Sequence, residues 1–253
     1  MHDKPVALVT GANQGIGLQI ARELAANSFT VLVGARSLAR GDDAARSIEG
    51  DARALQLDVT DRGSIAAAAE RVRGELGRLD VLVNNAAISN TRMTQNGLTL
   101  REYTAITRPS VVSLDEMRAV WETNVFGVVA VTQAMLPLLR ATPAARIVNV
   151  SSGVGSLTLN SDPTFPYRAQ FSPVYAASKT ALNAITLAFA IELEDAGIKV
   201  NAVSPGFTRT ALNGYEGTDT LEQGAAEAVR LALLGADAPT GTFSHATLGR
   251  IPW

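Results

Sequence analysis

The sequence predicts a single-domain α/β protein with a doubly wound, mostly parallel sheet and helices on both faces. Short apolar runs rich in β-branched residues alternate with longer stretches of Ala, Leu, Glu and Arg. These runs are apolar throughout, as expected for strands that are buried on both faces. The chain has 253 residues, 47% of them hydrophobic, which is enough for one large core.

Six of the apolar runs are expected to form strands, and the segments between them are expected to form helices. The predicted strands are Val6–Val9, Thr30–Val33, Ala54–Leu57, Val81–Val83, Arg146–Val150 and Lys199–Val203. Because the links between them are much longer than hairpin turns, neighbouring strands are expected to be parallel. Residues 1–253 are therefore taken as one domain.

Three segments are expected to form the walls of a substrate cleft. Residues 89–112 and 153–173 are rich in Thr, Ser, Asn, Pro or Gly, and each follows a predicted strand. Residues 207–217 are a third candidate. Ligands of α/β proteins bind beyond the carboxyl ends of the strands, and loops of such length are usually functional. Surface insertion without function is the alternative.

The composition favours a small molecule as partner. A net charge of −2 gives no electrostatic reason to expect a nucleic acid or an anionic membrane. Cysteine is absent, and His2 and His245 lie at opposite ends of the chain, which disfavours a zinc site. No secretory signal is recognised, and no uncharged apolar run approaches the ~20 residues that cross a bilayer. A cytoplasmic protein is expected.

The segment Thr10–Gly17 has the features of a Rossmann-type dinucleotide site. It lies between the first predicted strand and a helical stretch, and glycines there would let the backbone approach a pyrophosphate at the helix N-terminus. The spacing is GxxxGxG rather than GxGxxG, and a tight turn without a ligand is the alternative. The expected cofactor contacts in this turn are Gly11, Asn13, Gln14, Gly15, Ile16 and Gly17.

Arg36 favours NADPH as the cofactor. It ends the second strand, 19 positions after Gly17, where an NAD site would normally carry a carboxylate that binds the ribose diol. A guanidinium instead offers donors that match a 2′-phosphate, and Arg40 is close enough in sequence to contribute. The alternative is that both arginines are solvated surface charges.

Tyr175 and Lys179 are candidate catalytic residues because a spacing of four places them on one face of a helix. A phenol has a pKa of about 10, and a nearby ammonium would lower that value. Ser152 ends a predicted strand, where its hydroxyl could bind a substrate carbonyl, and Ser151 is its competitor. A serine hydrolase is disfavoured because neither a nearby histidine nor a GxSxG elbow is present.

Taken together, these motifs resemble the short-chain dehydrogenase/reductase family from Val6 to Trp253. The segments that carry the resemblance are Thr10–Gly17, Asp58-Val59, Asn84–Ala87, Asn124–Gly127, Val150–Ser152, Tyr175–Lys179 and Pro205–Thr210. Ala87 departs from the family pattern, which usually has glycine there. The interval from Ser152 to Tyr175 is also longer than in most members, which leaves both a monomer and a homo-oligomer open.

The resemblance implies a role for each matching residue. Tyr175 would be the general acid, Lys179 would lower its pKa and hold the nicotinamide ribose, and Ser152 would orient the carbonyl. Asn124 would complete a water-linked proton relay. The remaining residues would contact the cofactor: Asp58, Val59, Asn85, Ala86, Ala87, Pro205, Gly206, Thr208 and Thr210.

The sequence therefore predicts an NADPH-dependent carbonyl reductase that reduces a ketone or aldehyde to an alcohol. A non-catalytic NADP(H)-sensing protein and an alcohol dehydrogenase working in the oxidative direction remain as alternatives. Apolar and aromatic side chains of the cleft segments are expected to contact the substrate: Met93, Tyr103, Phe165, Tyr167, Phe171 and Tyr215. Ordinary loop packing is the alternative for each of them.

Overall fold

An eight-stranded sheet forms the centre of the computed structural model, which describes residues 4–91 and 98–253. Its strands are β1 (Val6–Val9), β2 (Thr30–Ala35), β3 (Ala52–Gln56), β4 (Val81–Asn84), β5 (Arg146–Val150), β6 (Lys199–Val203), β7 (Phe243–His245) and β8 (Gly249–Arg250). The strand order is β3-β2-β1-β4-β5-β6-β7-β8, and every neighbouring pair is parallel except β7 with β8.

Helices connect the strands. The α-helices are α1 (Gly15–Ala26), α2 (Leu38–Arg46), α3 (Arg62–Glu75), α5 (Leu100–Ile106), α6 (Leu114–Trp121), α7 (Gly127–Arg140), α8 (Leu157–Ser161), α9 (Tyr175–Glu192) and α10 (Leu221–Leu233). One π-helical turn, η1 (Glu122–Phe126), joins α6 to α7. The 3₁₀ turns are η2 (Gly153–Gly155), η3 (Arg168–Gln170) and η4 (Ala211–Asn213).

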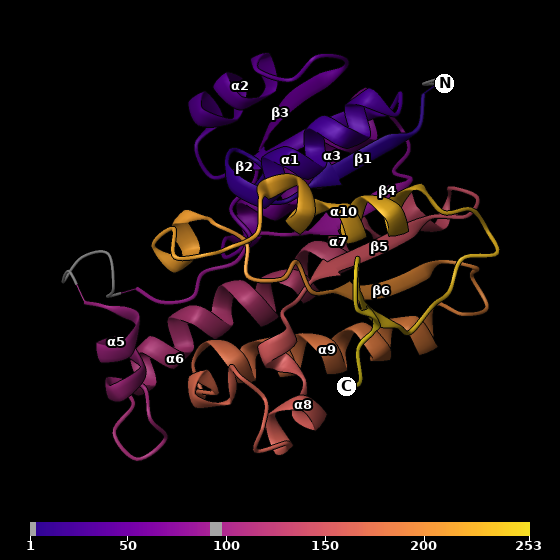
Figure 1. Cartoon of the computed structure of the whole chain (residues 1–253). Helices are drawn as coiled ribbons and strands as arrows, with labels where there is room; N and C mark the ends of the chain where they lie inside the picture. The colour runs from indigo at the N-terminus through magenta and orange to yellow at the C-terminus, as the bar shows by residue number, and fades with distance from the viewer. Residues whose placement is uncertain (1–3, 92–97) are drawn as a thin grey trace.

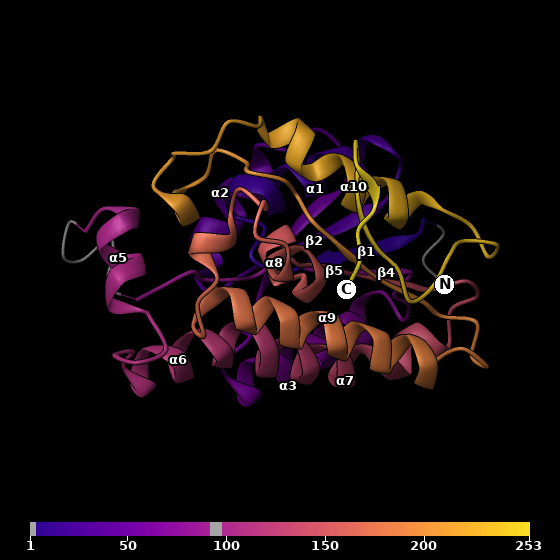
Figure 2. The same ribbon diagram turned by 60° about the horizontal axis from the view of Figure 1, so that its bottom comes forward.

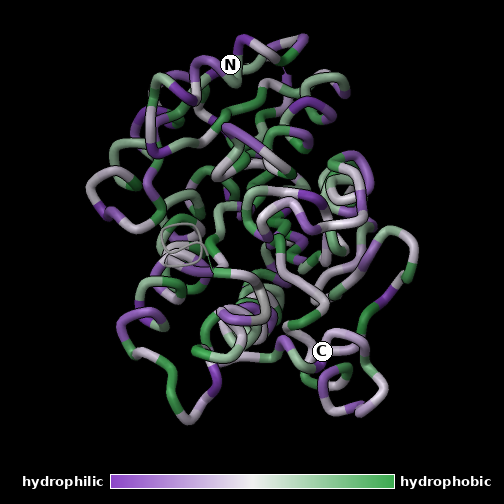
Figure 3. The backbone as a smooth tube through the Cα atoms, turned by 60° about the vertical axis from the view of Figure 1, so that its left-hand side comes forward, coloured by the Kyte–Doolittle hydropathy of each residue, from purple (hydrophilic) through white to green (hydrophobic). Residues whose placement is uncertain are grey.

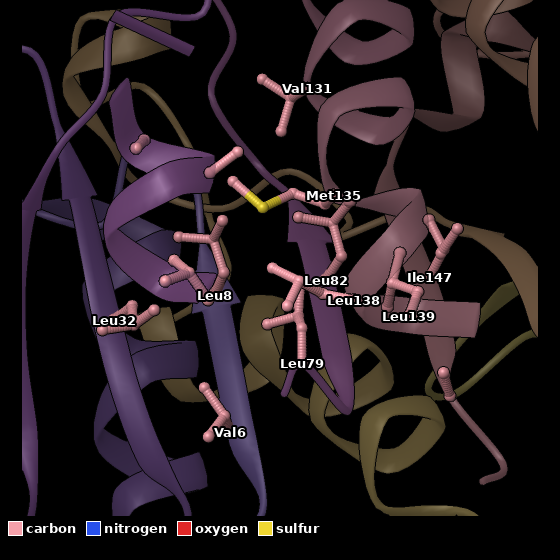
Figure 4. Close-up of a cluster of buried hydrophobic side chains, with 14 of the residues drawn as sticks. Val6, Leu8, Leu32, Leu79, Leu82, Val131, Met135, Leu138, Leu139 and Ile147 are labelled. Atoms are coloured by element: carbon pink, nitrogen blue, oxygen red, sulfur yellow. The ribbon is translucent and has the colours of Figure 1, made fainter. Parts of the chain in front are cut away.

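The helices form a layer on each face of the sheet (Figures 1 and 2). One apolar cluster joins the sheet to α1, α2 and α10, through residues such as Ile20 and Leu24 of α1. The other joins it to α3, α7 and α9, and Figure 4 shows Met135 of α7 reaching toward Leu8 and Leu82 of the sheet. Many hydrophilic residues lie along the outer turns of the chain (Figure 3). The predicted doubly wound fold is confirmed.

The helical stretch from Leu114 to Arg140 is long and apolar enough to pass a compositional test for a membrane span. Half of its most apolar window is buried inside the fold. The buried residues include Val131, Met135 and Leu139, which belong to the cluster shared with the sheet and α3. This stretch therefore packs as a core helix.

The predicted strands agree with β1, β5 and β6 at both ends and with β2, β3 and β4 within two residues. The two C-terminal strands were missed because β7 and β8 have only three and two residues, which is too short for a recognisable pattern. The cleft segments are also more structured than expected, since residues 89–112 contain α5 and residues 153–173 contain α8.

The strand order reverses between the neighbouring strands β1 and β4. The strands β2 and β3 follow on the β1 side of the sheet, and β5, β6, β7 and β8 follow on the β4 side. A crevice forms at such a point, beyond the carboxyl ends of the strands. The turn after β1 and the residues after β4 meet there: Asn85 Nδ2 donates hydrogen bonds to the backbone oxygens of Thr10 and Gly11, at 2.9 and 3.2 Å. The candidate site therefore lies in the crevice between the ends of β1 and β4.

Candidate active site

The glycine turn after β1 is shaped by two close approaches. Gly11 has a φ of +62°, and a Cβ there would lie 2.9 Å from the Cα of Ala86. At Gly17 a Cβ would lie 2.3 Å from Asn85 Nδ2, so α1 can pack this close to the end of β4 only without a side chain. The sequence signal of this turn is therefore explained by backbone geometry.

The N-terminus of α1 offers unpaired backbone donors. Its N-cap, Gln14, makes no side-chain capping bond, and the first turn of α1 contains no acidic residue. A Cβ at Gly15 would meet only Thr210 Cγ2, at 3.8 Å, so the space beside this turn is open. Asn13 is partly exposed next to it. Backbone N–H groups at such a position attract an anion.

Arg36 and Arg40 are exposed at the same edge of the sheet, just beyond β2. Within the described residues neither forms an ion pair. Asp58 lies after the adjacent strand β3, where its carboxylate accepts hydrogen bonds from the Thr60 N–H and hydroxyl at 2.9 and 2.7 Å. Val59 is buried behind it, and its backbone oxygen approaches Gly127. This edge thus combines two available guanidinium groups with a tightly held Asp-Val turn.

The segment after β4 is fixed by Thr10. The Thr10 hydroxyl oxygen accepts hydrogen bonds from the N–H groups of Asn85 and Ala86, at 3.0 and 2.9 Å. Ala87 has no left-handed backbone, so alanine causes no strain where the family pattern has glycine. Ala87 and Asn85 line a cavity of about 450 Å³.

Ser151 and Ser152 both line the cavity, but Ser152 is the more exposed of the two. Ser151 is almost fully buried, and its hydroxyl donates a 2.6 Å hydrogen bond to Asn183 Oδ1. Ser152 is partly exposed, and both Ser152 and Tyr175 line the cavity, where the Ser152 hydroxyl acts to lower the pKa of Tyr175. Alternation along β5 and its extension explains the difference, since successive side chains point to opposite faces. The structure thus distinguishes the two serines that the sequence left as competitors.

Tyr175 and Lys179 occupy the first turns of α9, and Lys179 Nζ lies 5.7 Å from the centroid of the Tyr175 ring. Lys179 is buried, and its ammonium donates a 2.8 Å hydrogen bond to the backbone oxygen of Val150. This contact holds the lysine against the end of β5, next to Ser152. The structure therefore brings the three candidate catalytic residues together.

Burial has the largest effect on the pKa values of Tyr175 and Lys179. Burial raises the pKa of Tyr175 to about 12, although Ser152 acts in the opposite direction. Burial also lowers the pKa of Lys179 to about 7. The expected lowering of the Tyr175 pKa by Lys179 is not found in the protein by itself, because Lys179 is not among the groups that shift this pKa. The Tyr175 phenol is neutral at neutral pH.

Asn124 lies in the π-helical turn η1 and is fully buried. Its amide exchanges two hydrogen bonds with the backbone of Ile88, at 3.0 and 2.9 Å, and donates a third, at 3.0 Å, to the Ser178 hydroxyl. Ser178 in turn donates to the backbone oxygen of Tyr175 at 2.7 Å. Asn124 therefore connects α6–α7, the segment after β4 and the start of α9. A π-helical turn often marks a functional position.

The segment after β6 covers the crevice from the other side. Thr208 is buried, and its hydroxyl donates a 2.7 Å hydrogen bond to the backbone oxygen of Pro205. Thr210 begins η4 with a capping box that includes Asn213. The Ser89 hydroxyl donates a 2.7 Å hydrogen bond to the backbone oxygen of Leu212, which connects two of the predicted cleft segments.

A cavity of about 450 Å³ brings these segments together. Ten predicted site residues line it: Ile16, Asn85, Ala87, Ser152, Tyr175, Lys179, Pro205, Gly206, Thr208 and Thr210. The other predicted residues do not line it: Gly11, Asn13, Gln14, Gly15, Gly17, Arg36, Arg40, Asp58, Val59, Ala86 and Asn124. The catalytic candidates thus share one space with part of the predicted cofactor site.

The predicted aromatic wall is correct in part. Tyr103, Phe165 and Tyr167 line the cavity. Phe171 lines a separate depression on the outside of the 153–173 segment, and Tyr215 is 65% exposed, so neither contributes to the wall. The prediction was wrong for Phe171 and Tyr215 because a loop sequence does not show which way a side chain points. Met93 lies outside the described residues.

The sequence analysis missed three polar residues around the cavity. Glu116 of α6 is buried and accepts hydrogen bonds from the Tyr103 hydroxyl and the Thr91 N–H, each at 2.8 Å, which fixes α5 against the cavity. Asp219 and His245 line the cavity from the C-terminal side. These residues have no motif around them. Only the rarity of histidine in the chain could have drawn attention to His245.

Comparisons with known proteins show the family of this chain. A family model described as short chain dehydrogenase matches residues 5–220. A protein called short-chain dehydrogenase anuI from Penicillium roqueforti is 39% identical over 92% of this chain and 90% of its own length. A (−)-isopiperitenone reductase from Mentha piperita is 32% identical over 94% of this chain and 95% of its own length.

Solved structures show the same arrangement. Salutaridine reductase from Papaver somniferum superimposes with a TM-score of 0.79 and 27% identity, over 96% of this chain and all of that one. A 3-ketoacyl-(acyl-carrier-protein) reductase from Brucella melitensis, solved as a complex with NADH, gives a TM-score of 0.78 and 25% identity, over 97% of each chain.

Proposed function

The chain belongs to the short-chain dehydrogenase family of oxidoreductases, and from this premise we propose that it is an NADPH-dependent reductase of ketones or aldehydes. The observation that carries the proposal is the position of Ser152, Tyr175 and Lys179 around one cavity next to the glycine turn. Two hydroxyls and an ammonium there match the needs of a carbonyl that must be held and protonated.

The residues present fit a phosphate-bearing dinucleotide. The open space beside Gly15 and the uncapped N-terminus of α1 suit a pyrophosphate. Arg36 and Arg40, which have no internal ion-pair partner in the described chain, suit a 2′-phosphate. Bound NADPH supplies the hydride that reduces the carbonyl carbon. The proposed cofactor is therefore NADPH rather than NADH.

Tyr175 is proposed as the proton donor. Its phenol is neutral at neutral pH because burial raises its pKa to about 12. As the carbonyl oxygen gains negative charge, Tyr175 transfers its proton to that oxygen and the substrate leaves as an alcohol. Ser152, which lines the same cavity, donates to the same oxygen and holds it in place. A neutral phenol favours reduction, since oxidation of an alcohol would require the phenolate.

Lys179 and Asn124 support this proton transfer. The Lys179 side chain lies beside the Tyr175 ring, and its protonated form stabilises the negative charge left on the phenol oxygen after the transfer. Its hydrogen bond to Val150 keeps it in that position. Asn124, through Ser178, fixes the backbone that carries Tyr175.

The test is a carbonyl panel assayed with NADPH and NADH side by side, with kcat/KM measured for each pair. We expect turnover of ketones or aldehydes with a preference for NADPH. Binding of NADPH without turnover of any carbonyl would overturn the proposal in favour of a non-catalytic cofactor-binding protein. Faster oxidation of the matching alcohols at neutral pH would overturn the proposed direction.

A further inference from the structure

A polar corner lies in the cavity wall that the proposed reaction does not use. It is formed by Asp219, which precedes α10, and His245, which ends β7. A Cβ at Gly206 would lie 2.3 Å from Asp219 Oδ2 and 3.0 Å from His245 Nε2, so both atoms border the same small space. Glycine at position 206 keeps that space free.

The imidazole of His245 is oriented by the turn that follows it. Its Nδ1 accepts hydrogen bonds from the N–H groups of Thr247 and Leu248, at 3.1 and 3.3 Å. A neutral imidazole that accepts at Nδ1 carries its proton on Nε2. Within the described chain, Nε2 has no hydrogen-bond partner. His245 therefore presents a donor beside Gly206.

Asp219 presents an acceptor to the same space. Its carboxylate accepts a hydrogen bond from the Phe207 N–H at 2.9 Å and another from the Thr218 hydroxyl at 3.3 Å. An ionised carboxylate has about four acceptor positions, so capacity remains. In the described structure, Asp219 and His245 form neither an ion pair nor a hydrogen bond with each other.

Three aromatic rings also belong to the cavity wall. The rings of Phe165 and Tyr167 meet edge to face with centroids 5.7 Å apart, and Tyr167 packs against Phe207 at 6.1 Å. All three line the cavity. Such a surface binds a hydrocarbon body through its shape and area but offers few groups that would orient it. The polar corner would supply that orientation.

We propose that Asp219 and His245 bind a hydroxyl group that the carbonyl substrate carries apart from its reacting carbonyl. A hydroxyl can accept from His245 Nε2 and donate to Asp219 at the same time, whereas a second carbonyl can only accept and an ammonium can only donate. The substrate class is thus a hydroxy ketone or hydroxy aldehyde with an apolar body. This inference rests on the proposed function and deepens it.

Two pairs of ketones, matched in size, test the inference with NADPH as the reductant. One pair is 4-hydroxycyclohexanone and 4-methylcyclohexanone, and the longer pair is 4-(4-hydroxyphenyl)butan-2-one and 4-(4-methylphenyl)butan-2-one. The readout is the ratio of kcat/KM for the hydroxyl and methyl member of each pair. We expect a ratio of about ten or more in at least one pair, the size of a good hydrogen bond.

Variants of His245 separate recognition from folding. The side-chain oxygen of asparagine can accept the hydrogen bonds that Nδ1 accepts, which keeps the turn, but asparagine does not reach the Nε2 position. H245N should therefore bring the ratio of kcat/KM between the hydroxyl and methyl ketones to within about threefold of one. Glutamine places its amide near the Nε2 position, so H245Q should recover much of the preference. A purely structural role of His245 would not change the ratio between two matched ketones.

Asp219 has a matched control in Asp237, an exposed carboxylate away from the cavity. D219N should reduce the ratio, and D237N should leave it unchanged. Ratios near one for the wild type in both pairs would overturn this inference and leave the proposed function intact. An unchanged ratio in H245N and D219N would also overturn it. Turnover of neither pair would overturn this inference, whereas the proposed function would be overturned only by the absence of turnover across the wider carbonyl panel.

Discussion

The Lys179 ammonium lies over the ring of Tyr175, with Nζ 5.7 Å from the ring centroid. The two residues are one helical turn apart on α9, so the helix itself sets their separation. Tertiary structure adds the hydrogen bond from Lys179 to Val150, which fixes the ammonium beside the end of β5. Four predictions follow from this arrangement and its surroundings.

Replacing Tyr175 with phenylalanine should remove the proton donor and keep the ring. We expect kcat/KM for a carbonyl substrate to fall by about 10²- to 10⁴-fold, the usual contribution of a general acid, with little change in the Kd for NADPH. Steady-state kinetics and cofactor titration measure these quantities. Y215F is the matched control, since Tyr215 is exposed outside the cavity. A fully active Y175F enzyme would remove Tyr175 from the mechanism.

The adjacent serines should respond in different ways to substitution by alanine. S152A removes a donor to the carbonyl oxygen, and kcat/KM should fall by about a hundredfold at unchanged stability. S151A leaves the buried Asn183 oxygen without its 2.6 Å hydrogen bond and should reduce the free energy of unfolding by about 1–3 kcal/mol. Kinetics and urea unfolding distinguish the two. The reverse pattern would assign the catalytic hydroxyl to Ser151.

Changing Arg36 to aspartate should alter cofactor preference. A carboxylate there repels a 2′-phosphate and can bind a ribose diol. The ratio of kcat/KM for NADPH over NADH should fall by roughly ten- to a hundredfold. Arg118, an exposed arginine paired with Asp115 on α6, gives the control R118D, which should keep the wild-type ratio. An unchanged ratio in R36D would show that Arg36 is only a surface charge.

The buried Lys179 should make stability depend on pH. Burial lowers its pKa to about 7 in the folded protein from an ordinary value of 10.5, so between these values the unfolded chain holds a proton that the folded chain has released. The free energy of unfolding should therefore rise with pH through this interval. Over pH 7 to 9, urea unfolding of wild type should show a steeper rise than K179M.

K199M is the control for this measurement, because it removes a different lysine and should keep the wild-type slope. Comparison of slopes cancels the titration of other groups that the variants share. Equal slopes in the wild type and K179M would mean that Lys179 remains charged in the folded protein.

Local patterns were sufficient to predict six of the eight strands and the proximity of Tyr175 and Lys179. The apolar runs of β1, β5 and β6 match the structure at both ends, and Tyr175 and Lys179 are close because both belong to one helix. Gly11 and Gly17 carry their own signal, since glycine is rarely required unless backbone segments approach each other. Such features depend on residues that are near one another in the chain.

The cavity wall could not be predicted in the same way. The sequence suggested Phe171 and Tyr215 for it, but the structure excludes both and adds Asp219 and His245. The orientation of a loop side chain depends on contacts with segments far away in sequence. An example is the 2.7 Å hydrogen bond between Ser89 and the backbone of Leu212, which are 123 positions apart.

The sequence by itself determined the doubly wound sheet, the glycine turn and the pairing of Tyr175 with Lys179, because each arises from periodicity or from spacing within one element. Only the tertiary structure decided that the Ser151 hydroxyl is buried against Asn183 while Ser152 stays partly exposed, and that Asp219 and His245 share a space beside Gly206. It also decided the proton affinities of Tyr175 and Lys179. Burial controls these properties, and burial results from long-range packing that no local pattern encodes.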